Sequence, residues 1–378
     1  MDHIELLREL VSINSVFPNE AQLANFLAEQ LKKRKFNVRI EKFNENRMNV
    51  LASRGSKGTP LLLYAHMDTV PPYGYEQSNP YKLREENGKL YGLGAYDMKA
   101  GIAAILKAVE KLDNERAIKI IFVSDEEADS QGCYQVTRTD FLNDVEFAIA
   151  TEISDIEDIN EKTRTITLGR RGRVQYEIDV FGKSCHAAMI ENGISAITEA
   201  SKIAVELENM NSQLPTHPDL NMGNQFVRRI YSETVSLSIP DKATLIVDRH
   251  LVLPETAESV RDDLQSTINK LYDDGTLRNQ KRATVKVKPR EVPYLLPYVT
   301  SKENQNVQKL ANLIKEKLGV EANYNCGMSV ADENLIAMQG IPIITYGPIG
   351  SGEHSCGEWV SKKSYLELIE VLKAFIEN

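Results

Sequence analysis

Short, uninterrupted runs of apolar residues, each of strand length, alternate with helical patterns along this chain. Leu61–Ala65, Ile118–Ser124 and Phe147–Ala150 are such runs, and Gly101–Leu112 is expected to form a helix between the first two. A strand that is apolar on both faces must be covered on both faces, whereas a half-exposed strand alternates apolar and polar residues. The pattern therefore predicts an α/β fold in which helices cover both faces of the main sheet.

The middle of the chain has a different texture, which predicts a second domain. Arg164–Phe181 alternates apolar and polar residues, as a half-exposed strand does. Further elements are expected at Ala196–Met210 (helix), Ala243–Leu253 (strand), Ser259–Tyr272 (helix) and Ala283–Lys288 (strand). Outside this part, helices are expected within Ile4–Lys35, at Asn304–Lys317 and at Lys363–Ile376, and a buried strand at Ile341–Gly347. We therefore expect a larger domain of residues 1–166 and 291–378, with a small α+β domain of residues 167–290 inserted into it.

Composition narrows the classes of partner and the compartment. The net charge of −9 argues against a general affinity for nucleic acid or for anionic membranes. No apolar run reaches the roughly 20 residues of a membrane-spanning helix, and the first residues do not form a signal-peptide pattern. The four cysteines form no C-x-x-C pair, which favours a reducing compartment over a disulfide framework. We therefore expect a cytoplasmic protein that binds neither nucleic acid nor membranes.

Histidines and carboxylates follow the buried runs, at the points where the predicted strands end. His66 and Asp68 follow the first run, Asp125, Glu126 and Glu127 the second, Glu152 the third, and His354 the last, while Asp97 lies in a loop before a predicted helix. In open α/β sheets, ligand sites form beyond the carboxyl ends of the strands. The sequence therefore predicts that these side chains gather at one edge of the sheet.

So many carboxylates can share a small site only if cations neutralise them, because like charges at close range raise each other's pKa. Imidazole and carboxylate together suit zinc, with cobalt or manganese as substitutes. Taken singly, the residues have ordinary explanations: a hydrogen-bonded core histidine for His66, a helix N-cap for Asp97, solvated or first-turn acids for Glu126 and Glu127, an exposed loop acid for Glu152 and a turn residue for His354. Their arrival from four separate strands favours a site with two metal ions, which would activate a water molecule.

The motifs at these positions resemble those of one hydrolase family. His66-x-Asp68-x-Val70-Pro71, Gly92-x-Gly94-Ala95-x-Asp97-Met98-Lys99, Asp125-Glu126-Glu127, a His186 motif and His354-x-x-x-Glu358-Trp359-Val360 occur in order along nearly the whole chain. The family contains acetylornithine deacetylase, succinyl-diaminopimelate desuccinylase, aminoacylase and carboxypeptidase G. The resemblance implies a mixed-sheet catalytic domain and an inserted, ferredoxin-like lid or dimerisation domain.

The resemblance also implies a role for each residue of these motifs. Asp97 would bridge two Zn²⁺ ions. His66 and Glu152 would complete one metal site, and Glu127 and His354 would complete the other. Glu126 would act as general base and acid, and Asp68 would orient His66. His186 would donate to the oxyanion from the partner subunit of a homodimer, although a surface-loop histidine is its ordinary explanation. The peptide bond between Asp97 and Met98 would be cis.

The chain departs from the family pattern at the residues that would bind substrate. The family's arginine for the substrate carboxylate falls at His250, with Arg249 beside it, and adjacent strand residues face opposite ways. His250 is either this contact or an ordinary strand residue. The expected reaction is hydrolysis of an amide bond in a small N-acyl amino acid. The alternatives are a dipeptidase or aminopeptidase with the same metals, and a metal-binding protein without catalysis.

Overall fold

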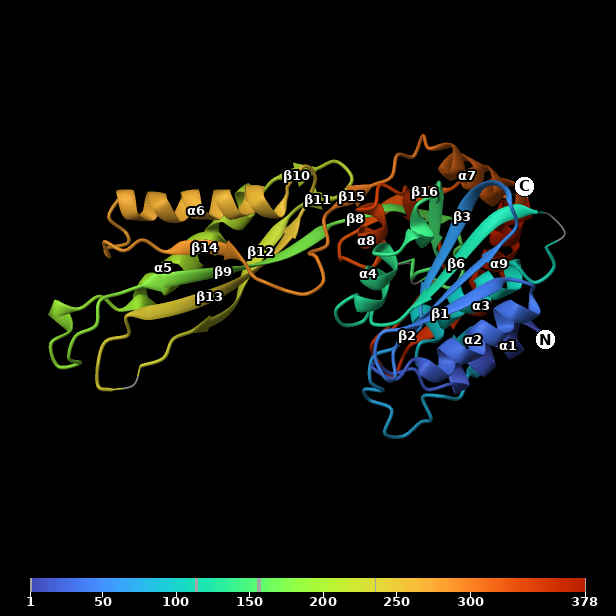
Figure 1. Ribbon diagram of the computed structural model, residues 1–378, viewed down its shortest axis with the longest axis horizontal. Coiled ribbons are helices and arrows are strands. Elements are labelled where there is room, and N and C mark those ends of the chain that lie inside the picture. The colour runs from blue at the N-terminus through green and yellow to red at the C-terminus, as the bar shows by residue number, and fades with distance from the viewer. Residues whose placement is uncertain (1, 113–114, 155–157, 235, 378) are drawn as a thin grey trace. The chain divides into compact units, whose positions relative to one another are not determined.

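The computed structural model describes residues 2–112, 115–154, 158–234 and 236–377. The chain divides into two compact units (Figure 1). Unit 1 consists of Met1–Gly169, Val299–Cys326 and Ala331–Asn378, and unit 2 of Arg170–Tyr298 and Gly327–Val330. Each unit has a hydrophobic core of its own.

Unit 1 is built on a mixed sheet with the strand order β1-β2-β6-β3-β7-β17-β8-β15, and β16 pairs with β8. The strands are β1 (Asn37–Lys42), β2 (Met48–Arg54), β3 (Lys57–His66), β6 (Arg116–Val123), β7 (Phe147–Ala150), β8 (Thr165–Arg170), β15 (Tyr298–Val299), β16 (Asn323–Gly327) and β17 (Ile343–Thr345). Strands β6, β3, β7 and β17 run parallel, whereas β1 and β2 pair antiparallel, as do β2 and β6. A second, antiparallel sheet contains β18 (Gly350–Ser351), β19 (Trp359–Ser361), β5 (Lys89–Tyr91) and β4 (Arg84–Glu86).

Helices cover the main sheet on both faces, which confirms the predicted α/β class. The helices of unit 1 are α1 (His3–Ser12), α2 (Ala21–Lys33), α3 (Ala100–Ala108), α4 (Gln131–Thr137), α7 (Gln305–Leu318), α8 (Glu333–Ala337) and α9 (Lys362–Glu377), with short turns η1 (Ala95–Lys99) and η2 (Asp140–Leu142). Figure 1 shows α4 and α8 on one side of β3 and β6, and α3 and α9 on the other. Successive side chains of β3 point to opposite faces of the sheet, and their contacts agree with this division. Leu63 lies in the main core, whereas the Tyr64 hydroxyl donates to Asp332 at the start of α8.

Unit 2 has one four-stranded antiparallel sheet with the order β12-β13-β9-β14. Its elements follow the order β9 (Gly172–Phe181), α5 (Ala196–Asn209), β12 (Asn224–Tyr231), β13 (Lys242–Leu251), α6 (Ala257–Asp273) and β14 (Thr284–Val287), with a small β10 (Thr216–His217) and β11 (Asn221–Met222) ladder and short turns η3 (Ile190–Asn192) and η4 (Met210–Gln213). The core lies between one face of this sheet and the helices α5 and α6. The order β-α-β-β-α-β with this strand arrangement confirms the expected ferredoxin-like fold.

Three of the differences from the sequence expectation have a local reason. The predicted strand Arg164–Phe181 is two strands, because β8 is buried throughout in the main sheet while β9 alternates in the sheet of unit 2. The helix expected to reach Leu112 ends at Ala108, where the Glu110 amide bonds to the Lys107 carbonyl and tightens the last turn. Strand β12 was not anticipated, because this edge strand contains mostly polar or exposed residues and a bulge.

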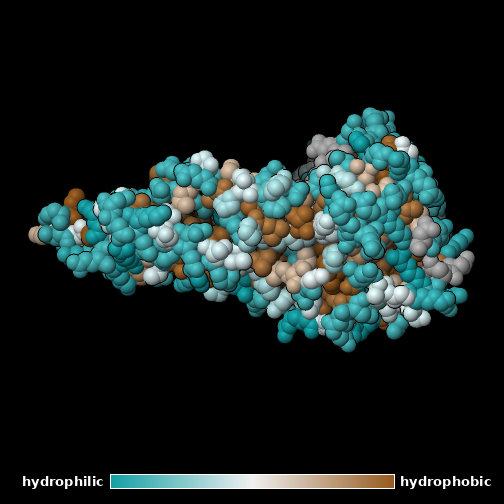
Figure 2. All heavy atoms as spheres, turned by 90° about the horizontal axis from the view of Figure 1, so that it is seen from above, coloured by the Kyte–Doolittle hydropathy of each residue, from teal (hydrophilic) through white to brown (hydrophobic). Residues whose placement is uncertain are grey.

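The surface agrees with the charged composition. On the face shown in Figure 2, hydrophilic side chains cover most of both units, and hydrophobic ones form separate patches. Among the helices that the structure describes, none is both long and apolar enough to cross a lipid bilayer.

Candidate metal centre

The parallel pairing of three strands brings most of the predicted ligands to one edge of the main sheet. His66 is the last residue of β3, which pairs with β6 on one side and with β7 on the other. Asp125, Glu126 and Glu127 follow β6, and Glu152 follows β7. Because all three strands run in the same direction, their carboxyl ends meet at the same edge.

The first candidate ligand group consists of His66, Asp97 and Glu152. The Nε2 atom of His66 lies 3.0 Å from Asp97 Oδ1 and 2.9 Å from Glu152 Oε1. The other ring nitrogen, Nδ1, lies 3.1 Å from the Asp68 carbonyl oxygen and 3.5 Å from its carboxylate. A proton held on Nδ1 by Asp68 leaves the Nε2 lone pair directed at the two carboxylates, as a metal ligand requires.

The second candidate group consists of Asp97, Glu127 and His354, so Asp97 is shared. The Nε2 atom of His354 lies 2.9 Å from Glu127 Oε2 and 3.5 Å from Asp97 Oδ2. Asp97 therefore faces the first group with Oδ1 and the second with Oδ2. Such an arrangement suits a carboxylate that bridges two cations. The Asp97–Met98 peptide bond is cis, as the resemblance implies.

The electrostatics of these residues fit bound cations. Burial alone would lower the pKa of His66, but hydrogen bonds with Asp68, Asp97 and Glu152 outweigh it and raise that pKa well above its usual value. Hydrogen bonds with Asp97 and Glu127 raise the pKa of His354 to about 11. Without a metal, each histidine must hold a proton to offset the surrounding carboxylates. Divalent cations would supply that positive charge, and imidazole nitrogen with carboxylate oxygen is a donor set that zinc accepts.

Glu126 belongs to neither group but interacts electrostatically with members of both, His66 and Glu152 of the first and Glu127 of the second. Burial raises its pKa well above the usual value, against the opposing charge of His66, while Asp332, Glu152 and Glu127 raise it further. The amides of Glu126 and Glu127 donate to Asp68 Oδ1 (3.2 Å) and Oδ2 (2.9 Å). Asp68 thus holds His66 and the two glutamates in one hydrogen-bonded arrangement. A buried carboxylate of raised pKa next to a ligand cluster has the properties of a general base.

One buried acid in this region had no role in the sequence interpretation. Glu358 is 2% exposed, and its carboxylate accepts from the amides of Gly94 (2.8 Å), Tyr96 (2.8 Å) and Asp97 (3.1 Å). Burial raises its pKa to about 8. Glu358 therefore fixes the backbone of the loop that presents Asp97. Its place in the last quoted motif, just before the buried Trp359-Val360, was the only sequence signal for this role.

The remaining predicted site residues, His186, Arg249 and His250, belong to unit 2. His186 is exposed, and its Nδ1 accepts from the Ala188 amide (3.1 Å). Arg249 is 2% exposed, and its Nη2 forms an ion pair with Glu255 in the interior of the unit. His250 is partly exposed on the opposite face of β13, where Nδ1 lies 3.0 Å from Asn224 Oδ1. Of the two adjacent residues, His250 is the one that a solute can reach.

Glu20 is a fully buried acid near the candidate centre, and it makes the stability of the fold depend on pH. Burial, and then the charge of Asp68, raise its pKa from 4.5 to about 8. The carboxyl group is therefore neutral in the folded protein below about pH 8, while in the unfolded chain it ionises from about pH 4.5. Its contribution to stability is present below pH 4.5 and is lost as the pH rises to 8.

We therefore expect Glu20→Gln to become progressively more stable than the wild type between pH 5 and pH 8.5. Urea unfolding at both pH values measures the difference in free energy of unfolding between variant and wild type. The exposed Glu45, changed to glutamine, is the control and should show no such trend. A difference that stays constant, or that shrinks with pH, would contradict the assignment of a raised pKa.

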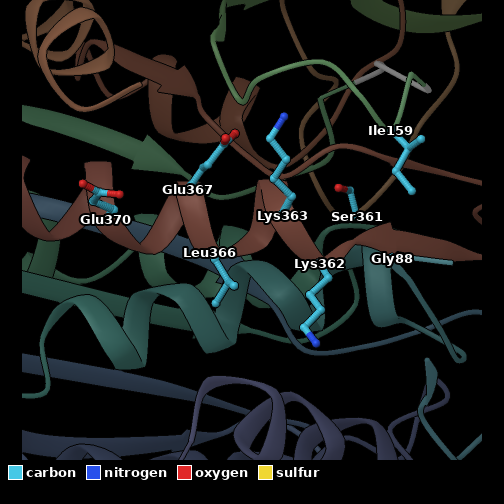
Figure 3. A pocket seen from close by; sticks show the side chains of 8 residues that line it. All are labelled: Gly88, Ile159, Ser361, Lys362, Lys363, Leu366, Glu367 and Glu370. Atoms are coloured by element: carbon cyan, nitrogen blue, oxygen red, sulfur yellow. The ribbon is translucent and has the colours of Figure 1, made fainter. Parts of the chain in front are cut away.

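A separate pocket lies on another part of unit 1 (Figure 3). It is lined by side chains of α9 and the residues before it together with two loops: Gly88, Ile159, Ser361, Lys362, Lys363, Leu366, Glu367 and Glu370. Its lysines are engaged, Lys362 with Glu85 (2.7 Å) and Lys363 with the Asn160 carbonyl (3.1 Å). None of the candidate metal ligands lines this pocket.

Comparison with known proteins agrees with the geometry. The succinyl-diaminopimelate desuccinylase of Rickettsia bellii (strain OSU 85-389) is 24% identical over 395 residues, covering 99% of this chain and 96% of that protein. The crystal structure of aminopeptidase PepT from Bacillus cereus ATCC 10987 superposes with a TM-score of 0.78 at 19% identity, covering 99% of this chain and 97% of that one. The YXEP protein of Bacillus subtilis, described as a dinuclear metal binding peptidase, superposes with a TM-score of 0.72 at 16% identity, covering 99% and 96%.

A family profile decides the assignment. The profile of the Peptidase family M20/M25/M40 matches residues 62–378, which include His66 and His354, the first and last of the candidate ligands. The matched region thus contains both ligand groups and the whole of unit 2. The chain belongs to the Peptidase family M20/M25/M40 and is a hydrolase of amide or peptide bonds.

Proposed function

We propose that this chain hydrolyses the amide bond of a small N-acyl amino acid, using two divalent metal ions and Glu126 as general base. The observation that carries the proposal is the shared Asp97, whose two oxygens face two separate ligand groups next to Glu126. The name of the desuccinylase relative, which acts on an acylated diamino acid, supports this substrate class.

In the proposed site, His66, Asp97 and Glu152 would hold one ion, and Asp97, Glu127 and His354 the other. Zinc is the proposed metal, with cobalt or manganese as substitutes. When bound, the ions would supply Lewis acidity to the carbonyl group and lower the pKa of water. Glu126 accepts the proton of the attacking water and returns it to the leaving nitrogen, for which a carboxyl group of raised pKa is suited.

Hydrolysis of dipeptides or amino-terminal peptide bonds is the second candidate, because the solved structures with this fold include an aminopeptidase and a dinuclear metal binding peptidase. The same base and ligands serve both reactions, so the two candidates differ only in the substrate pocket. The metal-loaded protein, assayed against N-acetyl and N-succinyl amino acids and against dipeptides, separates them by kcat/KM. Full metal occupancy without turnover on any of these amides would instead favour a metal-binding protein that has lost catalysis.

We propose His250, rather than Arg249, as the contact for the substrate carboxylate. Arg249 is paired with Glu255 in the interior of unit 2, whereas His250 faces the open side of the sheet. Because Nδ1 lies 3.0 Å from Asn224 Oδ1, a protonated His250 has one N–H, on Nε2, left for a carboxylate, and it binds a carboxylate less strongly than the bidentate fork of arginine does. We therefore propose that the substrate carboxylate contributes less to affinity in this protein than it would with an arginine at this position.

Unit 2 supplies His186 to the active site of a partner subunit in this proposal, which makes the homodimer the working form. We propose residues 167–290 as the lid and dimerisation domain. Because Nδ1 of His186 accepts from the Ala188 amide, the neutral ring carries its proton on Nε2 and can donate it to an oxyanion. Loss of one such donor lowers kcat by about 10²–10³-fold.

Mixing two inactive variants tests whether His186 acts across subunits. We expect His186→Ala and Glu126→Gln each to have low kcat alone, and their mixture to regain activity after subunit exchange. The mixed dimer then has one active site with an intact Glu126 and an intact His186. Analytical ultracentrifugation of each variant checks that it is dimeric. A mixture whose activity does not exceed the summed activities of the two separate variants would contradict action in trans.

A further inference from the structure

The segment that presents Glu126 and Glu127 has no regular secondary structure of its own. Between β6 and α4, residues 124–130 form turns, and both Asp125 (φ 75°) and Ser130 (φ 61°) have left-handed backbone conformations. Such conformations are uncommon for residues other than glycine and persist only where the surroundings hold them. The position of Glu126 therefore depends on contacts made from outside this segment.

Asn49, at the start of β2, holds the two ends of the segment together. Its Oδ1 accepts from the Ser124 amide (3.2 Å) and its Nδ2 donates to the Gly132 carbonyl (2.8 Å). The side chain is fully buried, so these bonds do not compete with water. The ends lie so close that a Cβ atom on Gly132 would be 2.1 Å from the Ser124 carbonyl oxygen and 2.7 Å from Asn49 Oδ1.

Arg47 holds the middle of the same segment. Its Nη1 lies 2.6 Å from Asp125 Oδ1, and the other oxygen of Asp125 accepts from the Gln131 amide (3.0 Å). The Asp125 side chain is 1% exposed and that of Arg47 15%, so the ion pair is shielded from solvent. Nε of Arg47 lies 3.9 Å from the buried Glu20. A shielded pair of this kind is costly to break, because its acid would remain buried without a counter-charge.

We propose that Arg47 and Asn49 are positioning residues for hydrolysis: together they fix the 124–132 segment so that Glu126 lies where it can take up the proton. Arg47 pairs with Asp125, and Asn49 bonds to Ser124 and Gly132, so both act on Glu126 through these residues. The inference rests on the proposed role of Glu126. Its physical basis is that a general base displaced by about 1 Å can lose about 10²-fold in rate.

The kinetic test compares Arg47→Met, Arg47→Lys and Asp125→Asn at saturating Zn²⁺. We expect Arg47→Met to lower kcat about 10–100-fold and to leave KM within about threefold of the wild type. Arg47→Lys keeps a positive charge and should recover most of the lost kcat. Asp125→Asn keeps the left-handed conformation, which asparagine tolerates, but loses the ion pair, so it should lower kcat as Arg47→Met does.

Arg34→Met is the matched control, because Arg34 is also partly buried in unit 1, where it pairs with Glu110 (3.5 Å). This variant should lose stability without a change in kcat. The double variant Arg47→Met with Asp125→Asn should have a kcat close to that of either single variant, since both remove the same ion pair. An unchanged kcat in folded Arg47→Met, or effects that multiply in the double variant, would overturn the proposal.

A second measurement does not depend on activity and so separates this inference from the proposed function. Hydrogen exchange of a peptide spanning residues 124–132 reports whether the Glu126 and Glu127 amides remain bonded to Asp68. We expect faster exchange in Arg47→Met and in Asn49→Leu than in the wild type and Arg34→Met. If the wild type turns over no amide yet exchange behaves as expected, the proposed function fails and the positioning contact stands. Equal exchange in all variants would overturn the contact itself.

Discussion

Replacing Glu126 by glutamine is expected to leave two metal ions bound and to lower kcat by about 10²–10⁴-fold. Glutamine has nearly the same shape as glutamate but cannot accept a proton. Glu126 belongs to neither ligand group, so its loss should not weaken metal binding directly. A steady-state assay together with metal analysis of the same sample measures both quantities.

Two other glutamates in unit 1 serve as controls for this variant. Glu127→Gln alters a candidate ligand 2.9 Å from His354, so it should lose metal as well as activity. Glu110→Gln alters an acid paired with Arg34 and Lys107, and should retain both. A Glu126→Gln protein with most of its wild-type kcat would remove Glu126 from the mechanism, and one that lost metal would make it a ligand instead.

Asp97→Asn is expected to weaken both metal sites at once, and more than the loss of a residue that only orients a ligand. Asp97 is the one residue common to the two groups, with Oδ1 3.0 Å from His66 and Oδ2 3.5 Å from His354. Removing a partner that only orients a ligand lowers metal affinity about 10–100-fold. Loss of a shared ligand should therefore exceed about 100-fold at both sites, and turnover should fall with it.

Metal content after dialysis against a weak chelator measures this effect. We expect two zinc equivalents in the wild type, about one in His354→Ala, which alters only the second group, and fewer in Asp97→Asn. The metal-induced rise in Tm gives an independent measure, because a ligand that binds only the folded state stabilises it. It should be large in the wild type and small in Asp97→Asn. Retention of both ions by Asp97→Asn would show that Asp97 is not a bridge.

Much of the fold could be predicted from local patterns of residues. The continuous apolar runs became β3, β6 and β7 of a covered sheet; β7 has the expected ends, and those of β3 and β6 differ by one to four residues. Their parallel order also explains why His66, Asp125 and Glu152, which are far apart in sequence, lie at one edge. These features follow from periodicity and from strand direction, which a short stretch of sequence encodes.

Other features depend on contacts that no local pattern encodes. Arg249 and His250 are adjacent in sequence, yet one is buried with Glu255 and the other is partly exposed, which depends on what packs on each face of β13. Arg47 directly precedes β2 and Asn49 is its second residue, in a stretch of sequence without a motif. They contact Asp125 and Gly132 because β2 and β6 are neighbours in the sheet, with the start of β2 beside the end of β6.

The amino-acid sequence by itself determined the α/β class, the ferredoxin-like insertion and the family, because these follow from periodicity and from motifs of fixed spacing. Only the tertiary structure decided how the protons and charges are arranged around Asp97. It also decided which buried side chains hold the turn that presents Glu126. The physical reason is that burial and hydrogen bonding are set by neighbours from distant segments, and these forces control both pKa values and positions.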